Sequence, residues 1–315
     1  MNLLIKNSFF VLVFFVVGFM VEKIFSGIYT AIITPFDEYD LIDYNALGNL
    51  IEFQISSGVD GIVVCGTTGE SPTLSPEEHD TVIDFVVKKV NKRLPVIAGT
   101  GSNSNYEAIQ MTLHAQEFGA DASLQVLPYY NKPSQEGMYR HFKKIASSTK
   151  LPIIIYNIKG RCGVNLETQT LLRLINECPN IVGVKEASGD MNQIREVIAN
   201  APPYFSVFSG DDSLALDVIK AGGDGVIATT SNLVPKEYSR MVHAALQGNF
   251  AEAEEINSKL LPLFKAAFIE SNPMCIKYMA SVKGMCKPIW RLPICEPLPV
   301  TQEKIKEEMK KFGLI

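Results

Sequence analysis

A lysine follows directly on a short apolar run near the middle of the chain. Lys185 comes after Ile181–Val184, within the sequence VGVKEASG at 182–189. If the run is a buried strand, the low dielectric at its end lowers the pKa of the lysine. The neutral amine then attacks a ketone and forms an imine. The alternative is a structural lysine paired with Glu186 or another carboxylate, and the position alone leaves both interpretations open.

Hydroxyl-bearing side chains follow two other apolar runs. Thr67 and Thr68 stand between glycines in CGTTGE at 65–70, a tight turn whose hydroxyls and amides suit a carboxylate. Tyr156 closes another run, with Arg161 just beyond it. A phenol of pKa about 10 is a weak base, and hydroxyls that pass its proton to solvent make it usable. The alternatives are a polar turn, a packing aromatic and a solvated arginine.

Eight short β-branched runs alternate with longer segments of helical period from Gly27 onward. Continuous apolar runs are typical of parallel strands that are buried on both faces. Eight such units without a Gly-rich dinucleotide fingerprint favour a closed (β/α)8 TIM barrel over an open α/β sheet. The carboxyl ends of all strands then meet at one face. The expected strands are 28–34, 61–64, 95–98, 122–127, 152–156, 181–185, 205–209 and 225–228.

Helix signals fill the intervening segments. Ser75 to Glu78 supplies an N-cap, a proline at the first helical position and a capping-box glutamate, and Ser104 to Glu107 repeats the capping-box arrangement. The segment 235–248 is expected to close the barrel. Three helices without intervening strands then follow at 249–269, 273–283 and 301–312. We therefore expect a catalytic barrel over 25–248 and a small C-terminal helical domain over 249–315.

Residues 1–24 form a hydrophobic N-terminal extension. The apolar run from Phe9 to Val21 is short for a membrane span of about 20 residues and fits a signal-peptide core. No small-x-small cleavage site follows it, and Met20 could itself start the chain. We expect a mis-set start or an unstructured extension. The alternative is a segment that associates with a membrane.

Composition excludes several classes of function. A net charge of −5 with interspersed signs provides no basic surface for nucleic acid. The six cysteines show no CxxC spacing, which is typical of reduced thiols in a cytoplasmic enzyme. The four histidines are scattered and form no HExxH motif. We therefore expect no bound catalytic metal.

Six motifs at the ends of the expected strands resemble the 4-hydroxy-tetrahydrodipicolinate synthase family of class I aldolases, over about Phe25 to Leu314. The resemblance implies a lyase that condenses pyruvate with L-aspartate 4-semialdehyde in the diaminopimelate route to lysine. It implies no cofactor. The motifs are GTTGE at 66–70, YYNKPSQEG at 129–137, IIYNIKGRCG at 154–163, VGVKEASG at 182–189, FSGDD at 208–212 and GGDGVIA at 222–228.

The resemblance also implies roles for the residues that could catalyse the reaction. Lys185 matches the Schiff-base lysine, and Tyr156 matches the tyrosine that shuttles protons. Thr67 and Tyr130 match its relay partners, with Tyr130 reaching in from a neighbouring subunit. That geometry needs at least a dimer, and the family is commonly a homotetramer, a dimer of dimers. The alternative for both tyrosines is packing at the barrel rim.

Substrate contacts follow in the same way. Thr68 and Ile227 match residues that line the pyruvate site, and Arg161 matches the arginine that receives the semialdehyde carboxylate. The family usually has a proline before this arginine and a threonine after it, where this chain has Ile158–Gly160 and Cys162. Loss of the proline is expected to loosen the segment that positions Arg161.

Three other functions compete with this interpretation. N-acetylneuraminate lyases and 2-keto-3-deoxy-sugar-acid aldolases share the lysine and the tyrosine but generally lack an arginine at the position of Arg161. The paired threonines and Arg161 favour the synthase. A catalytically silent, membrane-attached module that binds small acids is a further alternative, supported only by the hydrophobic N-terminus.

An effector site for L-lysine is also implied, because lysine-sensitive members of the family carry one at their tight dimer interface. The carboxylate of Glu107 suits an amino group, and the other side chains offer polar contacts. Glu107 also has a role as a capping residue, and His79 could simply flank a helix, so a structural role for both stays open. The matching positions are Ser71, His79, Asn103, Glu107 and Tyr129.

Overall fold

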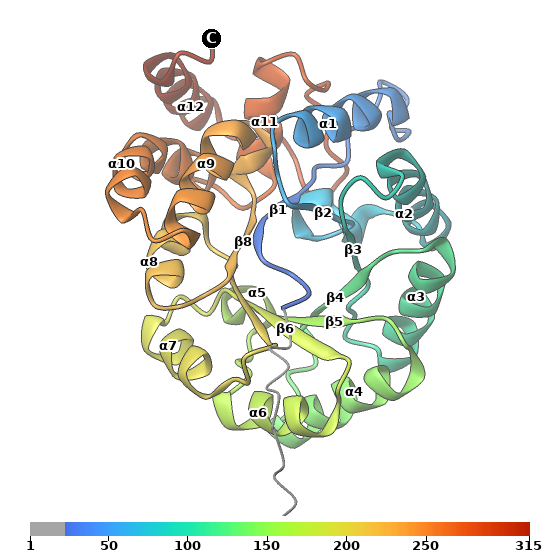
Figure 1. Cartoon of the computed structure of the whole chain (residues 1–315). Helices are drawn as coiled ribbons and strands as arrows, with labels where there is room; N and C mark the ends of the chain where they lie inside the picture. The colour runs from blue at the N-terminus through green and yellow to red at the C-terminus, as the bar shows by residue number, and fades with distance from the viewer. Residues whose placement is uncertain (1–22) are drawn as a thin grey trace, which may run out of the picture.

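The computed structural model describes residues 23–315, and within them eight parallel strands close into a barrel in sequence order (Figure 1). The last strand pairs with the first, which confirms the expected closed barrel over an open sheet. The strands are β1 Gly27–Ala31, β2 Gly61–Val64, β3 Val96–Gly99, β4 Ala122–Val126, β5 Ile153–Asn157, β6 Ile181–Glu186, β7 Ser206–Ser209 and β8 Gly225–Ala228.

Helices cover the outside of the barrel. The barrel helices are α1 Tyr44–Ser56, α2 Pro76–Val90, α3 Asn105–Phe118, α4 Gln135–Ser148, α5 Lys159–Cys162, α6 Thr168–Glu177, α7 Met191–Asn200, α8 Ala215–Lys220 and α9 Pro235–Leu246. Four 3-10 turns follow three of the strands: η1 Thr67–Gly69 and η2 Ser71–Thr73 after β2, η3 Asp212–Leu214 after β7 and η4 Thr230–Asn232 after β8.

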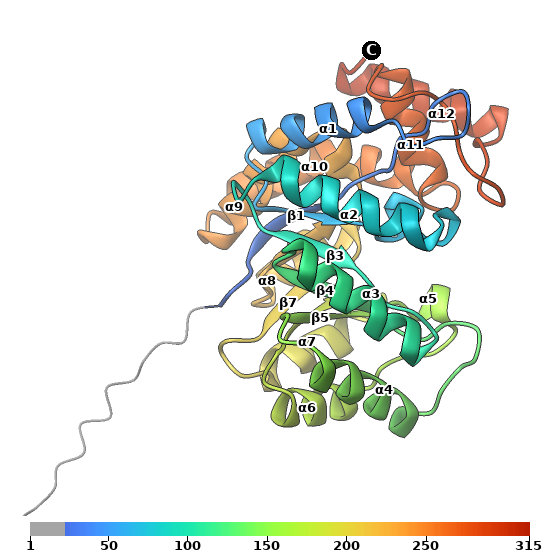
Figure 2. The ribbon, with the colours of Figure 1, turned by 90° about the vertical axis from the view of Figure 1, so that its right-hand side faces the viewer.

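Three further helices follow the barrel, as expected. They are α10 Phe250–Ala267, α11 Met274–Val282 and α12 Pro299–Phe312. Helix α10 packs against α9, and α11 and α12 lie beside it on the same side of the barrel as α1 (Figures 1 and 2). The division into domains at residue 248 stays a prediction, and the extension expected over 1–24 lies, apart from its last two residues, outside the described part of the chain. Within that part, none of the helices combines the length and hydropathy that crossing a membrane requires.

Local sequence signals account for most element ends, and two of them differ from expectation. The Ser75–Glu78 capping box forms in full, with both reciprocal hydrogen bonds. At Ser104 only half of the box forms, because the carboxylate of Glu107 accepts instead from the hydroxyl of Ser102. The first strand ends at Ala31 rather than at residue 34, although the residues after it remain buried. Burial continues there because the chain turns inward toward η1.

Candidate active site

Lys185 lies on β6 with its side chain in the barrel mouth and only 6% exposed. Burial lowers the pKa of its amine from 10.5 to about 8; the nearby charge of Asp212 opposes this change, and that of Arg161 adds to it. Glu186 points to the opposite face of the strand, where it accepts hydrogen bonds from Asn157 and Ser188 at 3.0 and 2.9 Å. In the described chain, Lys185 and Glu186 therefore do not form the ion pair that the sequence left open.

Tyr156 stands beside Lys185 on the neighbouring strand β5, directly in register with it. The lysine Nζ lies 4.3 Å from the centroid of the tyrosine ring. Burial raises the pKa of the phenol to about 12, while the charge of Arg161 and a hydrogen bond with the Thr67 hydroxyl oppose that increase. Ile227 on β8 shares the apolar barrel interior with Tyr156. The arrangement holds a partly neutral amine, a protonated phenol and a hydroxyl together above an apolar floor.

The predicted threonine turn is η1, directly after β2. Thr68 is buried, and its Oγ1 lies 3.4 Å from Thr229 Oγ1 and accepts a hydrogen bond of 3.0 Å from the Asn272 amide. The Oδ1 atom of Asn272 is also buried and has no hydrogen-bond partner in residues 23–315. Sequence reasoning missed both Thr229 and Asn272. The doubled threonine that follows GVIA was a signal for the first, whereas nothing local marked the second.

Arg161 is exposed on the short helix α5, and its guanidinium donates to the Asn272 carbonyl at 2.8 Å. Residues 159–162 form a helical turn that ends at Gly163 with φ +72°, and the loosening expected for this segment stays a prediction. Glycine adopts this left-handed conformation without steric cost. The buried thiol of Cys162 donates to the Leu127 carbonyl at 3.2 Å, which anchors the turn to the end of β4.

Tyr130 is highly exposed, with 91% of its surface accessible to solvent, and its backbone is left-handed at φ +70°. It follows Tyr129, which is also exposed. Neither ring packs into the core of the chain that carries it. The packing role left open for Tyr130 therefore does not describe its position in the single chain.

The five residues matched to the effector site lie on the connections after β2, β3 and β4. His79 is buried on α2, where its Nε2 lies 2.9 Å from the Gly99 carbonyl oxygen. Burial lowers the pKa of its imidazole, and the charge of Glu107 is close enough to oppose that change. The carbonyl of Asn103 accepts from Asn131, whereas Ser71 begins η2.

Asp212 is a third residue to which the sequence analysis assigned no role, although FSGDD was recognised as a motif. Its buried carboxylate accepts from the backbone amides of Thr229 and Thr230 at 3.0 and 2.7 Å. It also accepts the Thr230 hydroxyl at 2.6 Å. Asp212 thus fixes the loop after β8 and places negative charge near Lys185. No cluster of histidine, cysteine and carboxylate groups suited to a metal ion occurs in the described residues.

Comparisons with known proteins agree with this geometry. A model of the dihydrodipicolinate synthetase family matches residues 24–312. The 4-hydroxy-tetrahydrodipicolinate synthase of Aquifex aeolicus is 49% identical over 290 residues, which cover 92% of this chain and 98% of that protein. The crystal structure of the Aquifex aeolicus dihydrodipicolinate synthase superposes with a TM-score of 0.91 over 92% of this chain and 99% of its own.

Two further solved structures carry ligands. Dihydrodipicolinate synthase from Acinetobacter baumannii, complexed with pyruvate, is 41% identical with a TM-score of 0.90, and covers 92% of this chain and 99% of its own. The enzyme from Cyanidioschyzon merolae, with lysine bound, is 36% identical with a TM-score of 0.89, and covers 94% and 99%. On the extent of the family match and the level of identity, the chain belongs to the dihydrodipicolinate synthetase family.

Proposed function

We propose that this chain acts as a 4-hydroxy-tetrahydrodipicolinate synthase through a Schiff base between Lys185 and pyruvate. The relatives that match nearly its whole length carry that name, and the enzyme class is lyase. They support this activity over the N-acetylneuraminate and sugar-acid aldolase alternatives. The observation that carries the mechanism is the buried Lys185 amine, with a pKa of about 8, beside the Tyr156 ring.

The neutral amine of Lys185 attacks the ketone carbon of pyruvate, and the carbonyl oxygen leaves as water while the C=N bond forms. Tyr156 donates a proton to the departing oxygen, and Thr67 connects the phenol to the exterior. The imine draws electrons from the pyruvate methyl, which loses a proton and becomes the enamine carbon that attacks the aldehyde. Burial of the phenol supports its role as a proton donor, since it is protonated throughout the physiological range.

Two groups receive the substrate carboxylates in this proposal. Thr68 and the amides of η1 hold the pyruvate carboxylate, and Ile227 packs beneath its methyl group. Arg161 receives the carboxylate of L-aspartate 4-semialdehyde. Of the five N–H donors of a guanidinium, Arg161 gives one to Asn272, so a bidentate face remains for the substrate. Its exposed position on α5 supports a role for the second substrate, which arrives from solvent.

The relay requires a second subunit. Tyr130 is proposed to enter the site of a neighbour and to join Thr67 and Tyr156, in a homotetramer built as a dimer of dimers. Its exposure in the single chain supports this arrangement, because a buried Tyr130 could not reach another molecule.

We further propose that 249–315 forms a distinct C-terminal helical domain. We place the enzyme in the cytoplasm, where its six free cysteines would stay reduced.

L-Lysine is proposed as an effector of this enzyme. The structure of the Cyanidioschyzon merolae relative has lysine bound, and the residues matched to such a site fall on the connections after β2, β3 and β4. The carboxylate of Glu107 would pair with an amino group of the ligand, and Ser71, His79, Asn103 and Tyr129 would line the site. Tyr129 adjoins Tyr130, which would connect this site to the proton relay.

Borohydride reduction in the presence of pyruvate tests the mechanism. We expect a reduced pyruvyl adduct on the peptide that contains Lys185, and condensation of pyruvate with the semialdehyde in a coupled assay. N-Acetylneuraminate serves as the control substrate and should not be cleaved. Lys283→Met, which changes another partly buried lysine, should retain the adduct. Label on a different lysine, or none, would overturn the Schiff-base assignment.

A further inference from the structure

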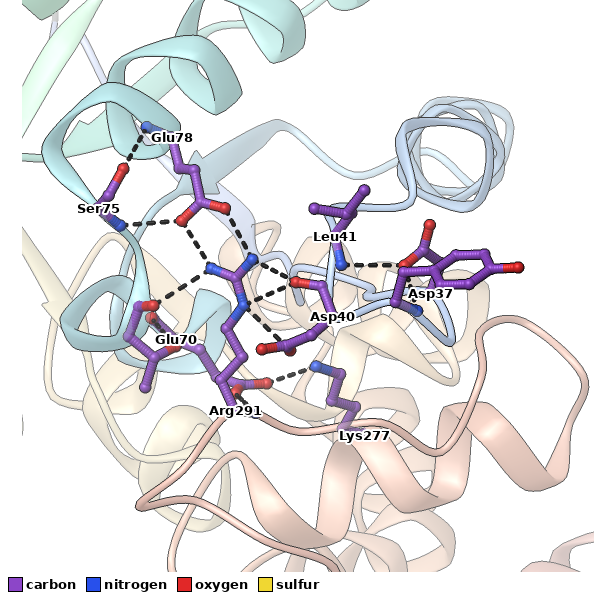
Figure 3. Close-up of polar contacts among 10 residues, drawn as sticks. Asp37, Asp40, Leu41, Glu70, Ser75, Glu78, Lys277 and Arg291 are labelled. Atoms are coloured by element: carbon purple, nitrogen blue, oxygen red, sulfur yellow. Dashed lines mark hydrogen bonds and ion pairs between the residues drawn. The ribbon is translucent and has the colours of Figure 1, made fainter.

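A buried ion pair joins the helices after the barrel to the threonine turn of the active site (Figure 3). Glu70 is the residue that follows η1, and Lys277 lies in the middle of α11. Both side chains are 0% exposed, and the lysine Nζ lies 2.5 Å from Glu70 Oε1. Burial lowers the pKa of the Lys277 amine, whereas the charge of Glu70 opposes that change. The pair therefore connects two segments that are far apart in the sequence.

The backbone of Glu70 shapes the turn that carries Thr67 and Thr68. It has φ +54°, a left-handed conformation that residues with a side chain rarely adopt. Its amide donates to the Thr67 carbonyl at 3.1 Å, which closes η1. Its own carbonyl accepts the amide and the hydroxyl of Thr73, both at 2.9 Å, which opens η2. A shift of Glu70 would therefore change the direction of both 3-10 turns.

The second carboxylate oxygen of Glu70 is also held by the C-terminal segment. The backbone amide of Arg291 donates to Oε2 at 3.3 Å. The Arg291 guanidinium forms a bidentate pair with Glu78 at 2.6 and 2.7 Å, which anchors the start of α2 (Figure 3). The Phe36 ring supports both cations, with Lys277 Nζ and Arg291 Cζ at 4.0 and 4.4 Å from its centroid. Glu70 is thus fixed from its backbone and from both side-chain oxygens.

We propose that Lys277 is a positioning residue for the reaction, which acts through Glu70 to hold Thr67 and Thr68 in place for pyruvate. The inference rests on the proposed function. A buried ion pair contributes little stability compared with an apolar pair of the same shape, because both charges are desolvated. What this pair supplies is a fixed distance between α11 and the turn. Small displacements of groups that orient a substrate cost on the order of 100-fold in rate.

Four forms of the full chain test the proposal: wild type, Lys277→Met, the double variant Glu70→Gln/Lys277→Met, and Lys283→Met as the matched control. Lys283 follows α11 and donates to the Leu233 carbonyl at 3.2 Å, away from the threonine turn. The midpoint of thermal unfolding, kcat and KM for pyruvate are measured for each. Rates are divided by the fraction of chains that borohydride traps with saturating pyruvate, so that unfolded molecules do not count.

Lys277→Met is expected to unfold at a lower temperature, since it leaves the Glu70 carboxylate buried without its charged partner. The double variant removes that charge and should regain most of the lost midpoint. Its kcat/KM for pyruvate should nevertheless stay on the order of 10- to 100-fold below wild type, mainly through KM, while Lys283→Met keeps the wild-type value. A double variant with wild-type kcat/KM would show that the pair serves stability alone and overturn the inference. Failure of wild type to trap pyruvate would instead overturn the proposed function.

Discussion

Replacing Lys185 by methionine should make the folded chain more stable at neutral pH, while it abolishes trapping of pyruvate. The pKa of this amine falls from 10.5 to about 8 on folding, because burial disfavours its charged form. A shift of this size is a cost of roughly 3 kcal/mol for carrying the protonated amine in the folded state. Methionine fills a similar volume but loses the contact of the cation with the Tyr156 ring, worth roughly 1 kcal/mol. The expected net gain is about 2 kcal/mol.

The gain must depend on pH in a defined direction. Since the folded pKa of Lys185 lies below its ordinary value, the unfolded chain binds more protons between pH 8 and pH 10.5. The cost to wild type is complete below about pH 8, decreases as the pH rises, and is gone above the unfolded pKa of about 10.5. The stability difference between Lys185→Met and wild type should therefore shrink toward zero over this interval.

Urea unfolding of both proteins at about pH 7 and at about pH 10 measures this difference, and other titrating groups cancel because they are shared. Lys259→Met is the control, since Lys259 is an exposed residue of α10 paired with Glu255. It should give no gain at either pH. Two results would refute the reasoning: a Lys185→Met protein no more stable than wild type at pH 7, or a gain of the same size at both pH values.

Three further variants test the other proposed roles. Arg161→Leu should spare pyruvate trapping but lower kcat/KM for the semialdehyde by about 100-fold, as expected when a charged hydrogen-bond partner is lost; equal loss of both would indicate a structural role. Mixing Tyr130→Phe with Lys185→Ala subunits should restore partial activity in hybrids, and inactive hybrids would exclude cross-subunit supply of the phenol. Millimolar L-lysine should inhibit wild type at saturating pyruvate, and Glu107→Ala should relieve it. Unchanged inhibition in that variant would remove Glu107 from the effector site.

The strands were predictable because each is encoded locally, as an apolar β-branched run bounded by turn residues. The strand prediction was least accurate where residues are buried but do not pair with a neighbouring strand. Residues 32–34 were expected in β1 and are buried, yet the strand ends at Ala31. There the chain turns toward η1, where the Thr34 hydroxyl donates to the Gly69 carbonyl at 2.7 Å. An apolar sequence pattern predicts burial but not strand pairing. Residues 32–34 are buried beneath a neighbouring loop, beyond the last paired residue of β1.

Lys185, Tyr156 and Thr67 could be placed from the sequence because parallel strands bring their carboxyl ends to one face of a barrel. Asn272 and Lys277 could not be placed in the same way. They belong to the region after the barrel, and no local sequence pattern predicts where that region packs against the barrel. The only signal for Lys277 was its charge within the apolar segment MCIKYMASV, since a lysine that is fully buried needs a partner. Its partner, Glu70, is distant in the sequence, and only the structure identifies it.

One physical cause sets the ionisation of both central groups in opposite directions. Burial disfavours charge, so it lowers the pKa of Lys185 to about 8 and raises that of Tyr156 to about 12. At pH 7, roughly a tenth of the amine is then neutral, against about 0.03% for an ordinary lysine. The phenol keeps its proton over the same range and is available to donate it to a departing oxygen. A separate base is not needed to create the nucleophile, whereas the raised pKa of the phenol makes return of its proton depend on the Thr67 hydroxyl. The position of the Thr67 hydroxyl therefore matters more to proton transfer through Tyr156 than to the reactivity of Lys185.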